Sequence, residues 1–295
     1  MIPANPPNNS SPANMSNENS LLNSFRLALS NRERKSARRR LTVIPESFVD
    51  FSSNDFLSLS RSSLFRSRLL TILNNAPLSH PFASGGSRLL DGNSEYIEEL
   101  ETLIASFHNA PSALLFNSGF DANVGILSCI PQPGDVIVYD ELIHASIHDG
   151  MRLSRAGKRV MFPHSSPGGL RDVLLDLIKT DPAIREGTRN VFVVIESLYS
   201  MEGDVAPVRE FVRVVEEMLP AGNGYFIIDE AHSTGVFGPR GAGVVQELGL
   251  EEKMFIRVHT FGKALACHGG MLSFISFSWC LADDAAVVLC CPETR

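Results

Sequence analysis

The chain has 295 residues, a formal net charge of −7 and a hydrophobic fraction of 44%. This length is sufficient for one large domain, or two smaller ones, with a buried core. The acidic balance argues against a general nucleic-acid binder, which needs clustered Lys and Arg. No segment approaches the ~20 uncharged apolar residues of a membrane span, so we expect a soluble protein with neither nucleic acid nor membrane as a partner.

The cysteines and the N-terminal segment bear on cellular location. Five cysteines are spaced too irregularly for a disulfide framework or a zinc site, which favours the cytoplasm and no bound metal. Residues 1–20 are mostly Asn, Ser and Pro and predict a disordered tail. The Arg-rich residues 26–40 leave a mitochondrial transit peptide as the alternative. We favour a helix that packs on a domain, because apolar residues recur at helical spacing at Leu21, Leu22, Phe25 and Leu29.

Between residues 110 and 262, short apolar runs alternate with helix-length polar stretches. The expected strands cover residues 113–116, 136–139, 159–162, 191–195, 225–228 and 255–258. The expected helices cover residues 121–128, 144–155, 169–179 and 207–219. Runs that are apolar throughout are typical of strands buried on both faces. The sequence therefore predicts an α/β domain with a mainly parallel sheet, whose chemistry lies at the carboxyl ends of the strands.

Several familiar motifs are incomplete. Residues 229–232 spell DEAH, but the chain lacks the G-x-x-x-x-G-K-[ST] loop that a nucleotide site of this type needs. No strand is followed by the G-x-G-x-x-G loop of dinucleotide-binding domains. His144 and His148 have the spacing of metal ligands on a helix, but no acidic residue lies between them. ATPase, dinucleotide and metal chemistry are all disfavoured.

Two residues at successive strand ends indicate a different chemistry. Asp229 follows one buried strand and Lys263 follows the next. A lysine in such a place is costly to bury unless its pKa falls or it becomes an imine. Taken alone, Lys263 would be interpreted as a solvated surface residue. Pyridoxal phosphate, however, needs a Schiff-base lysine, a carboxylate at its pyridine nitrogen, a ring over its face and donors for its phosphate.

The chain offers a candidate for each of these roles. Lys263 is the imine former, Asp229 is the carboxylate, and His144 opens a helix from which it can cover the ring. Backbone N–H groups after residue 117 start a helix and form an anion site, to which Thr260 adds a hydroxyl. Two further residues, Ser200 and His232, are expected to reach the phenolic oxygen of the cofactor. Ordinary alternatives are a helix cap for Ser118, a turn for Ser200 and a polar core residue for His232.

Seven motifs, in this order, resemble the α-oxoamine synthases, which are fold-type I pyridoxal-phosphate enzymes. The resemblance covers about residues 21–270 and is greatest to the branch that serves biotin biosynthesis. It implies a large cofactor domain with a mainly parallel, seven-stranded sheet flanked by helices. The motifs are residues 52–57 (SSNDFL), 84–88 (SGGSR), 116–120 (FNSGF), 144–146 (HAS), 200–204 (SMEGD), 229–235 (DEAHSTG) and 260–263 (TFGK).

The resemblance also implies a role for each matched residue. Lys263 forms the Schiff base and removes the Cα proton of the amino acid, Asp229 pairs with the pyridine nitrogen, and His144 stacks on the ring. The phosphate is held around the start of a helix, at Ser118, Gly119, Phe120 and Thr260. The remaining assignments are Ser200 and His232 at the phenolic oxygen, and Asn54 and Arg38 at the substrate.

The implied reaction is a decarboxylative condensation of an amino acid, expected to be L-alanine, with an acyl-CoA, expected to be pimeloyl-CoA. Its products are an α-oxoamine, CoA and CO2. Members of the family are homodimers, so the loop at residues 84–88 is expected near the partner's cofactor. One alternative is a related synthase with a sphingoid or polyketide type of acyl donor. The other is an inactive fragment that acts only by dimerising.

The likeness stops after Gly270 and returns near the C-terminus. We interpret residues 271–285 as an insertion, encoded by an unspliced intron, with a genuine loop as the alternative. Only 32 residues follow Lys263, so a small domain is expected to be mostly missing. The expected order is a tail (1–20), an N-terminal helix and arm (21–60), a cofactor domain (61–270), the insertion (271–285) and the start of the small domain (286–295).

Overall fold

The computed structural model describes residues 12–45, 47–274, 278–281 and 288–291. The chain divides into two units, Met1–Ser52 and Ser53–Arg295, which we describe separately. In the first unit, helix α1 (Pro12–Arg34) begins inside the range for which the sequence favours a tail. It contains the predicted apolar residues, whose exposed fractions lie between 42% and 57%: Leu21, Leu22, Phe25 and Leu29. The domain boundaries stay predictions.

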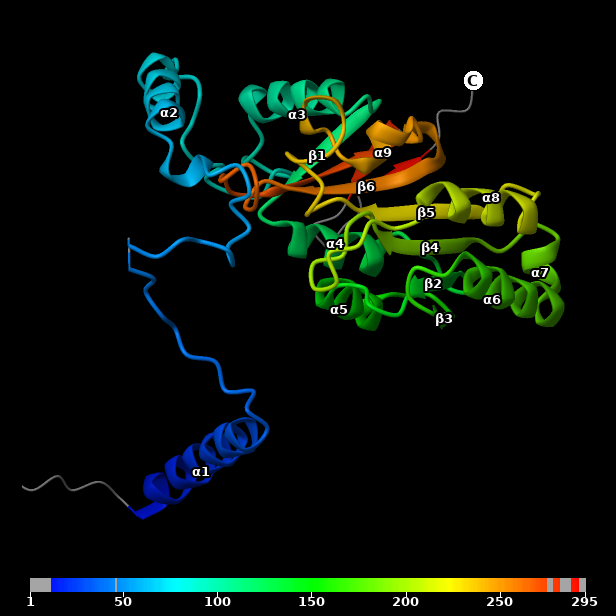
Figure 1. The fold of residues 1–295 in the computed structure, drawn as a ribbon, viewed down its shortest axis with the longest axis horizontal. Coiled ribbons are helices and arrows are strands. Elements are labelled where there is room, and N and C mark those ends of the chain that lie inside the picture. The colour runs from blue at the N-terminus through cyan, green and yellow to red at the C-terminus, as the bar shows by residue number, and fades with distance from the viewer. Residues whose placement is uncertain (1–11, 46, 275–277, 282–287, 292–295) are drawn as a thin grey trace, which may run out of the picture. The chain divides into compact units, whose positions relative to one another are not determined.

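The second unit is built on a seven-stranded sheet with the spatial order β1-β7-β6-β5-β4-β2-β3 (Figure 1). β7 runs antiparallel to β1 and β6, and the other neighbours pair in parallel. Every strand expected from the sequence lies within an observed one, so the predicted mainly parallel sheet is confirmed. The strands are β1 (Ser112–Phe116), β2 (Val136–Asp140), β3 (Lys158–Phe162), β4 (Val191–Glu196), β5 (Gly224–Asp229), β6 (Met254–Thr260) and β7 (Gly270–Phe274).

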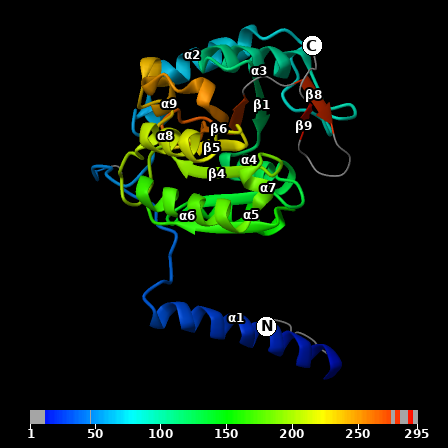
Figure 2. The same ribbon diagram turned by 90° about the vertical axis from the view of Figure 1, so that its right-hand side faces the viewer.

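Helices cover both faces of this sheet (Figure 2). On one face, α4 (Gly119–Cys129) and α5 (Ala145–Leu153) share an apolar core with alternate strand residues such as Phe192 and Val194. On the other face, α6 (Pro167–Thr180), α8 (Val208–Met218) and α9 (Val244–Leu248) pack against Val193 and Ile195. Alternate residues of β4 thus enter two different cores, which is why this strand is apolar throughout.

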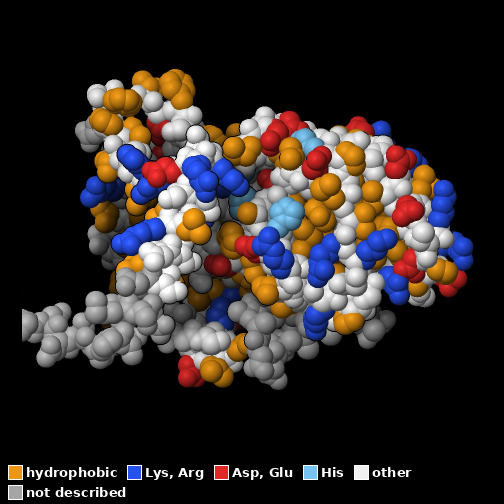
Figure 3. Space-filling view, turned by 90° about the horizontal axis from the view of Figure 1, so that it is seen from below, with side chains coloured by type: hydrophobic (Ala, Val, Ile, Leu, Met, Phe, Trp, Pro, Cys, Tyr) orange, Lys and Arg blue, Asp and Glu red, His pale blue; other side chains and the backbone are white. Residues whose placement is uncertain are grey.

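The remaining helices include one that packs on the edge strand. α3 (Glu95–Phe107) lies against β1, and its Ser94 cap accepts a hydrogen bond from the Ile97 N–H. The other two are α2 (Ser63–Asn75) and the short α7 (Pro182–Arg185). No helix in the described part of the chain is long and apolar enough to cross a bilayer. On the face seen in Figure 3, acidic, basic and apolar side chains are interspersed.

Strand β7 takes its residues from the junction with the expected insertion. Gly270 is followed by the first four residues of that range, and Met271, Leu272 and Phe274 are at most 3% exposed. β8 (Ser278–Leu281) and β9 (Val288–Cys291) form a separate antiparallel pair, and the rest of residues 275–295 lies outside the described residues. Sequencing the transcript tests the intron interpretation, because a spliced message that encodes Trp279 contradicts it.

Candidate active site

The carboxyl ends of β5 and β6 bring together three residues that the sequence singles out. Asp229 is the last residue of β5, and Lys263 lies three residues beyond the end of β6. The Nζ atom of Lys263 donates a hydrogen bond to Nε2 of His232 at 2.7 Å. The carboxyl groups of Asp229 and Glu196 lie near enough for their charge, when ionised, to act on the same ammonium group. The structure therefore places Lys263, Asp229 and His232 in one cluster.

Lys263 differs from the other lysines of the chain in its burial. The sequence has five lysines, and the structure describes all of them; Lys263 is partly buried, and the exposed ones are Lys35, Lys158, Lys179 and Lys253. Burial lowers the pKa of the Lys263 ammonium, although the charges of Asp229 and Glu196 act in the opposite direction. A lowered pKa increases the fraction of neutral amine, the form that attacks a carbonyl carbon. Lys263 thus has the properties of an imine-forming lysine.

His232 is held in its neutral form beside this lysine. Burial, together with the positive charge of Lys263, lowers the pKa of His232 to about 4. When Lys263 is an ammonium it can only donate, so Nε2 accepts and the ring proton of the neutral histidine is on Nδ1. His232 therefore orients the amine without adding a second positive charge.

Asp229 has a neighbouring carboxyl group in the sheet. It is 7% exposed and accepts hydrogen bonds from the Ala231 N–H at 2.8 Å and from the Asn123 side chain at 2.7 Å. Glu196 is its register partner on β4. Burial and the charge of Asp229 raise the pKa of Glu196 to about 8, although the His144 N–H and Lys263 lower it in part. Burial and the neighbouring charge thus favour the neutral form of Glu196.

The start of α4 forms an anion site opposite Thr260. Ser118 caps the helix by accepting the Asp121 N–H at 3.0 Å, whereas the first N–H groups of a helix, here those of Gly119 and Phe120, have no acceptor within it. A Cβ atom at position 119 would collide with Oγ1 of Thr260, so only glycine allows this close approach. Backbone amides at a helix N-terminus together with a hydroxyl suit a phosphate group.

His144 lies beside this anion site. It is the N-cap of α5, and its exposed ring stands edge-on to the ring of Phe120 with 6.2 Å between the centroids. Its Nδ1 atom accepts a hydrogen bond from the Ser146 N–H at 3.2 Å. The predicted ring-covering residue and the predicted phosphate donors are therefore neighbours in the structure.

Three other residues predicted for the site are not part of the cluster around Lys263. Ser200 is exposed on the loop between β4 and α8. Asn54 is exposed too, but the nearby Phe56 ring lies 6.5 Å from the His232 ring, which brings this segment to the cluster. Arg38 belongs to the first unit, where it donates to Glu33 at 2.8 Å. The roles of Ser200, Asn54 and Arg38 stay predictions.

Sequence reasoning missed two buried polar residues of the cluster. Asn123 on α4 and Ser146 on α5 are 2% and 0% exposed, and a hydrogen bond of 3.0 Å joins their side chains. The sequence does hold a signal for Asn123. It follows Gly119 by four residues, so it lies on the helix face that begins at the anion site.

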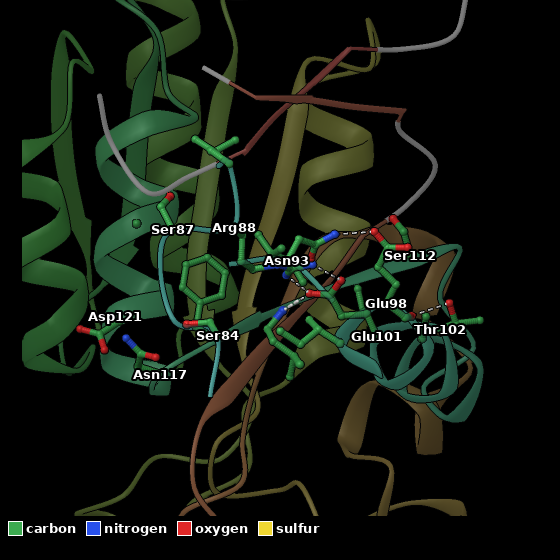
Figure 4. A pocket seen from close by; sticks show the side chains of 18 of the residues that line it. Ser84, Ser87, Arg88, Asn93, Glu98, Glu101, Thr102, Ser112, Asn117 and Asp121 are labelled. Atoms are coloured by element: carbon green, nitrogen blue, oxygen red, sulfur yellow. Dashed lines mark hydrogen bonds and ion pairs between the residues drawn. The ribbon is translucent and has the colours of Figure 1, made fainter. Parts of the chain in front are cut away.

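A cavity of about 1610 Å³ adjoins the anion site, between α3, β1 and α4 (Figure 4). Its lining includes Asn117, close to the start of α4, and Arg88 from the 84–88 loop. Arg88 binds both carboxylate oxygens of Glu101, at 2.5 and 3.0 Å, and Glu101 also accepts the Leu115 N–H at 2.8 Å. The loop predicted to lie near a partner's cofactor is thus anchored to β1.

Known proteins resemble this chain over most of its length. The family model "Aminotransferase class I and II" matches residues 46–285. The 8-amino-7-oxononanoate synthase of Emericella nidulans is 67% identical over 275 residues, which cover 93% of this chain and 63% of that protein. The aminoacyl transferase sphA of Byssochlamys spectabilis is 46% identical over 226 residues, 77% of this chain and 48% of that protein. The chain thus spans about half to two thirds of the length of these relatives.

A solved structure shares the fold. Serine palmitoyltransferase from S. paucimobilis, with a bound pyridoxal phosphate–myriocin aldimine, superposes with a TM-score of 0.70 at 25% sequence identity. The alignment covers 87% of this chain and 66% of that one. The predicted fold-type I architecture and the resemblance to 8-amino-7-oxononanoate synthases are confirmed.

Proposed function

Because the chain belongs to the aminotransferase class I and II family, whose cofactor is pyridoxal 5′-phosphate, we propose that it binds this cofactor through Lys263. The observation that carries the proposal is the partly buried Lys263, held between His232 and the carboxylate of Asp229. The other residues fit the remaining parts of the cofactor. Gly119, Phe120 and Thr260 would hold its phosphate, and His144 would cover its ring.

The chain's own groups set the protonation states that this chemistry needs. When bound, the pyridinium ring accepts the negative charge that develops at Cα of an amino acid. Asp229, as a carboxylate, would keep the ring nitrogen protonated. Lys263 in its amine form would remove the Cα proton, and neutral His232 would keep the amine oriented. Ser200 is assigned to the phenolic oxygen.

We infer that the reaction is the condensation of L-alanine with pimeloyl-CoA to an α-oxoamine, CoA and CO2, as a step of biotin biosynthesis. The 67% identity to the Emericella nidulans synthase supports this choice. Asn54 and Arg38 are the proposed substrate ligands. The identity to the sphA aminoacyl transferase favours, as a second candidate, the same condensation with a sphingoid or polyketide type of acyl donor.

We further infer a homodimer and a cytoplasmic location, with a mitochondrial location as the alternative because of the Arg-rich residues 26–40. In the dimer, the anchored loop at residues 84–88 would approach the partner's cofactor. Sedimentation velocity of the chain with pyridoxal phosphate should give the mass of two copies. A monomer that binds the cofactor with full affinity contradicts the shared site.

The cofactor proposal is tested by absorbance spectroscopy of the purified chain. Added pyridoxal phosphate should give the band of a protein imine, which Lys263→Ala abolishes and Lys253→Ala, at an exposed lysine, leaves unchanged. The acyl donor is then tested by measuring CoA release from a panel of acyl-CoAs with alanine, serine and glycine. Absence of the imine band overturns the cofactor proposal. An imine band without CoA release supports the inactive fragment instead.

A further inference from the structure

A buried chain of side chains connects Asp229 to His144. The Nδ2 atom of Asn123 donates to Oδ2 of Asp229 at 2.7 Å and to Oγ of Ser146 at 3.0 Å. Oγ of Ser146 lies 2.8 Å from Nδ1 of His144. The chain joins three elements, because Asn123 is on α4, Ser146 and His144 are at the start of α5, and Asp229 ends β5.

Each proton in this chain of hydrogen bonds has only one possible direction. An ionised Asp229 can only accept, so the nitrogen of the Asn123 amide must face it. The second amide hydrogen goes to Oγ of Ser146, whose hydroxyl proton can then be donated to Nδ1 of His144. The backbone N–H of Ser146 also points at this Nδ1, at 3.2 Å. Nδ1 therefore holds a lone pair, and the ring proton of neutral His144 is on Nε2.

The side-chain oxygen of Asn123 supports an electrostatic role for the residue. Its Oδ1 atom is buried and has no hydrogen-bond partner. A buried acceptor without a partner is unfavourable, and an apolar side chain of similar size would avoid that penalty. The two donor hydrogens, rather than packing, thus explain an asparagine at this position.

We propose that Asn123 is a positioning residue that couples the ionised carboxylate of Asp229 to the tautomer of His144. The consequence of this coupling for catalysis rests on the proposed function, which assigns Asp229 to the nitrogen of the cofactor ring and His144 to the face of that ring. Asn123 fixes both groups to α4, whose first turn carries the phosphate donors. The Nε2–H of His144 is thereby left free to donate to a group bound over α5.

The test observes the His144 ring directly and needs no cofactor. In the protein labelled with ¹⁵N at histidine, two-bond ¹H–¹⁵N correlations distinguish the two neutral tautomers, and a His144→Gln variant assigns the signals. The wild-type protein should show Nε2–H at His144 in the neutral ring. Asn123→Ala removes the donor that occupies Oγ of Ser146 and should raise the fraction of the Nδ1–H tautomer, although the Ser146 N–H still faces Nδ1. Asn123→Leu, which has a similar size but no donor hydrogens, should do the same.

Asn223 offers a matched control. It is 3% exposed, donates to the carbonyl oxygens of Ile184 and Arg189 at 2.9 and 2.8 Å, and likewise leaves its Oδ1 unpaired. Asn223→Ala also removes two buried hydrogen bonds donated by an asparagine, so it should destabilise the fold in a similar way. It should leave the His144 tautomer unchanged. The dissociation constant for pyridoxal phosphate should rise about tenfold in Asn123→Ala and stay the same in Asn223→Ala.

Several outcomes decide the proposal. An Nδ1–H tautomer at His144 in the wild-type protein overturns it, and so does an equal change of tautomer in Asn123→Ala and Asn223→Ala. If Asn123→Ala does not fold, Asn123→Ser, which keeps one donor, replaces it and should give a smaller change. If the tautomer results are as expected but pyridoxal phosphate does not bind, the proposed function fails and the coupling stands.

Discussion

Two carboxyl groups that are register partners on neighbouring strands differ in protonation because their surroundings differ. Asp229 accepts two short hydrogen bonds, from the Ala231 N–H and the Asn123 amide, which stabilise its charge. Glu196 is 4% exposed and faces that charge, so burial and repulsion raise its pKa to about 8. The neutral form of Glu196 is thus favoured at the end of β4, beside Asp229 at the end of β5.

This difference predicts how the stability of the cofactor-free protein depends on pH. The pKa of Glu196 is about 8 in the folded protein against an ordinary value of 4.5, so the folded state binds the proton more tightly than the unfolded chain. The free energy of unfolding therefore falls as the pH rises from about 5 through about 8. Glu196→Gln removes this titration, and the variant should lose less stability than the wild type over that interval, by at least about 1 kcal/mol.

Urea denaturation at several pH values measures this effect. Glu202→Gln, on an exposed loop, serves as the control and should follow the wild-type profile. Parallel profiles for the wild type and Glu196→Gln contradict the raised pKa.

The close contact between Gly119 and Thr260 predicts that position 119 of the anion site requires glycine. In Gly119→Ala the new Cβ atom displaces the Thr260 hydroxyl, so the dissociation constant for pyridoxal phosphate should rise at least about tenfold, the loss of a single charge-assisted hydrogen bond. Fluorescence titration measures it. Gly168→Ala is the control, because a Cβ atom at Gly168 meets no atom within 4 Å. Equal affinities in both variants contradict the assignment of the site.

The site residues that could be found from the sequence are those at the ends of predicted strands or at the start of a predicted helix. Asp229 and Lys263 stand at strand ends, and Gly119 begins a helix after a strand, so the fold class alone brings them to one edge. Asn123 stands inside a helix, where an isolated asparagine resembles a surface residue. Its partners, Asp229 and Ser146, are distant in the sequence, and only the three-dimensional packing of α4 on α5 reveals the contact.

Among the elements, β7 takes four of its five residues from the range that the sequence interpretation assigned to an insertion. It lies between β1 and β6, and Leu272 is 1% exposed within the core shared with α4 and α5. Leu272→Ala should therefore lower the free energy of unfolding by about 2–5 kcal/mol. Leu153→Ala, at a residue that is 65% exposed, should change it by less than about 0.5 kcal/mol.

Denaturant unfolding followed by circular dichroism compares these two variants. A loss in Leu272→Ala no larger than that in Leu153→Ala would show that another segment forms this strand in solution.

The strands were predictable to different degrees for a physical reason. Val191–Glu196 is apolar because both of its faces are buried, so its burial is visible in the sequence itself. Gly270–Phe274 is as deeply buried, but it follows a break in the family resemblance, which concealed its role. The helices α2 and α3 lie before the alternating region and have no flanking parallel strands to indicate them.

At the scale of the whole molecule, cofactor binding should be visible as stability. A ligand that binds only the folded state at one hundred times its dissociation constant adds about 2.7 kcal/mol to the free energy of unfolding. For a domain of this size, the melting temperature should rise by about 5–10 °C with pyridoxal phosphate. Differential scanning fluorimetry of the wild type and Lys263→Ala measures the shift, which should be smaller in the variant. An unchanged melting temperature in the wild type contradicts cofactor binding by the folded chain.

The central claim is that Lys263 is the residue that binds the cofactor, and one measurement tests it most directly. The protein is mixed with pyridoxal phosphate, reduced with borohydride to fix the imine, digested and mapped by mass spectrometry. The chain provides its own controls, because the other four lysines are exposed. We predict that the phosphopyridoxyl mass is found on the peptide that contains Lys263, at close to one label per chain. A label spread over Lys35, Lys158, Lys179 and Lys253, or no label on Lys263, would contradict the account.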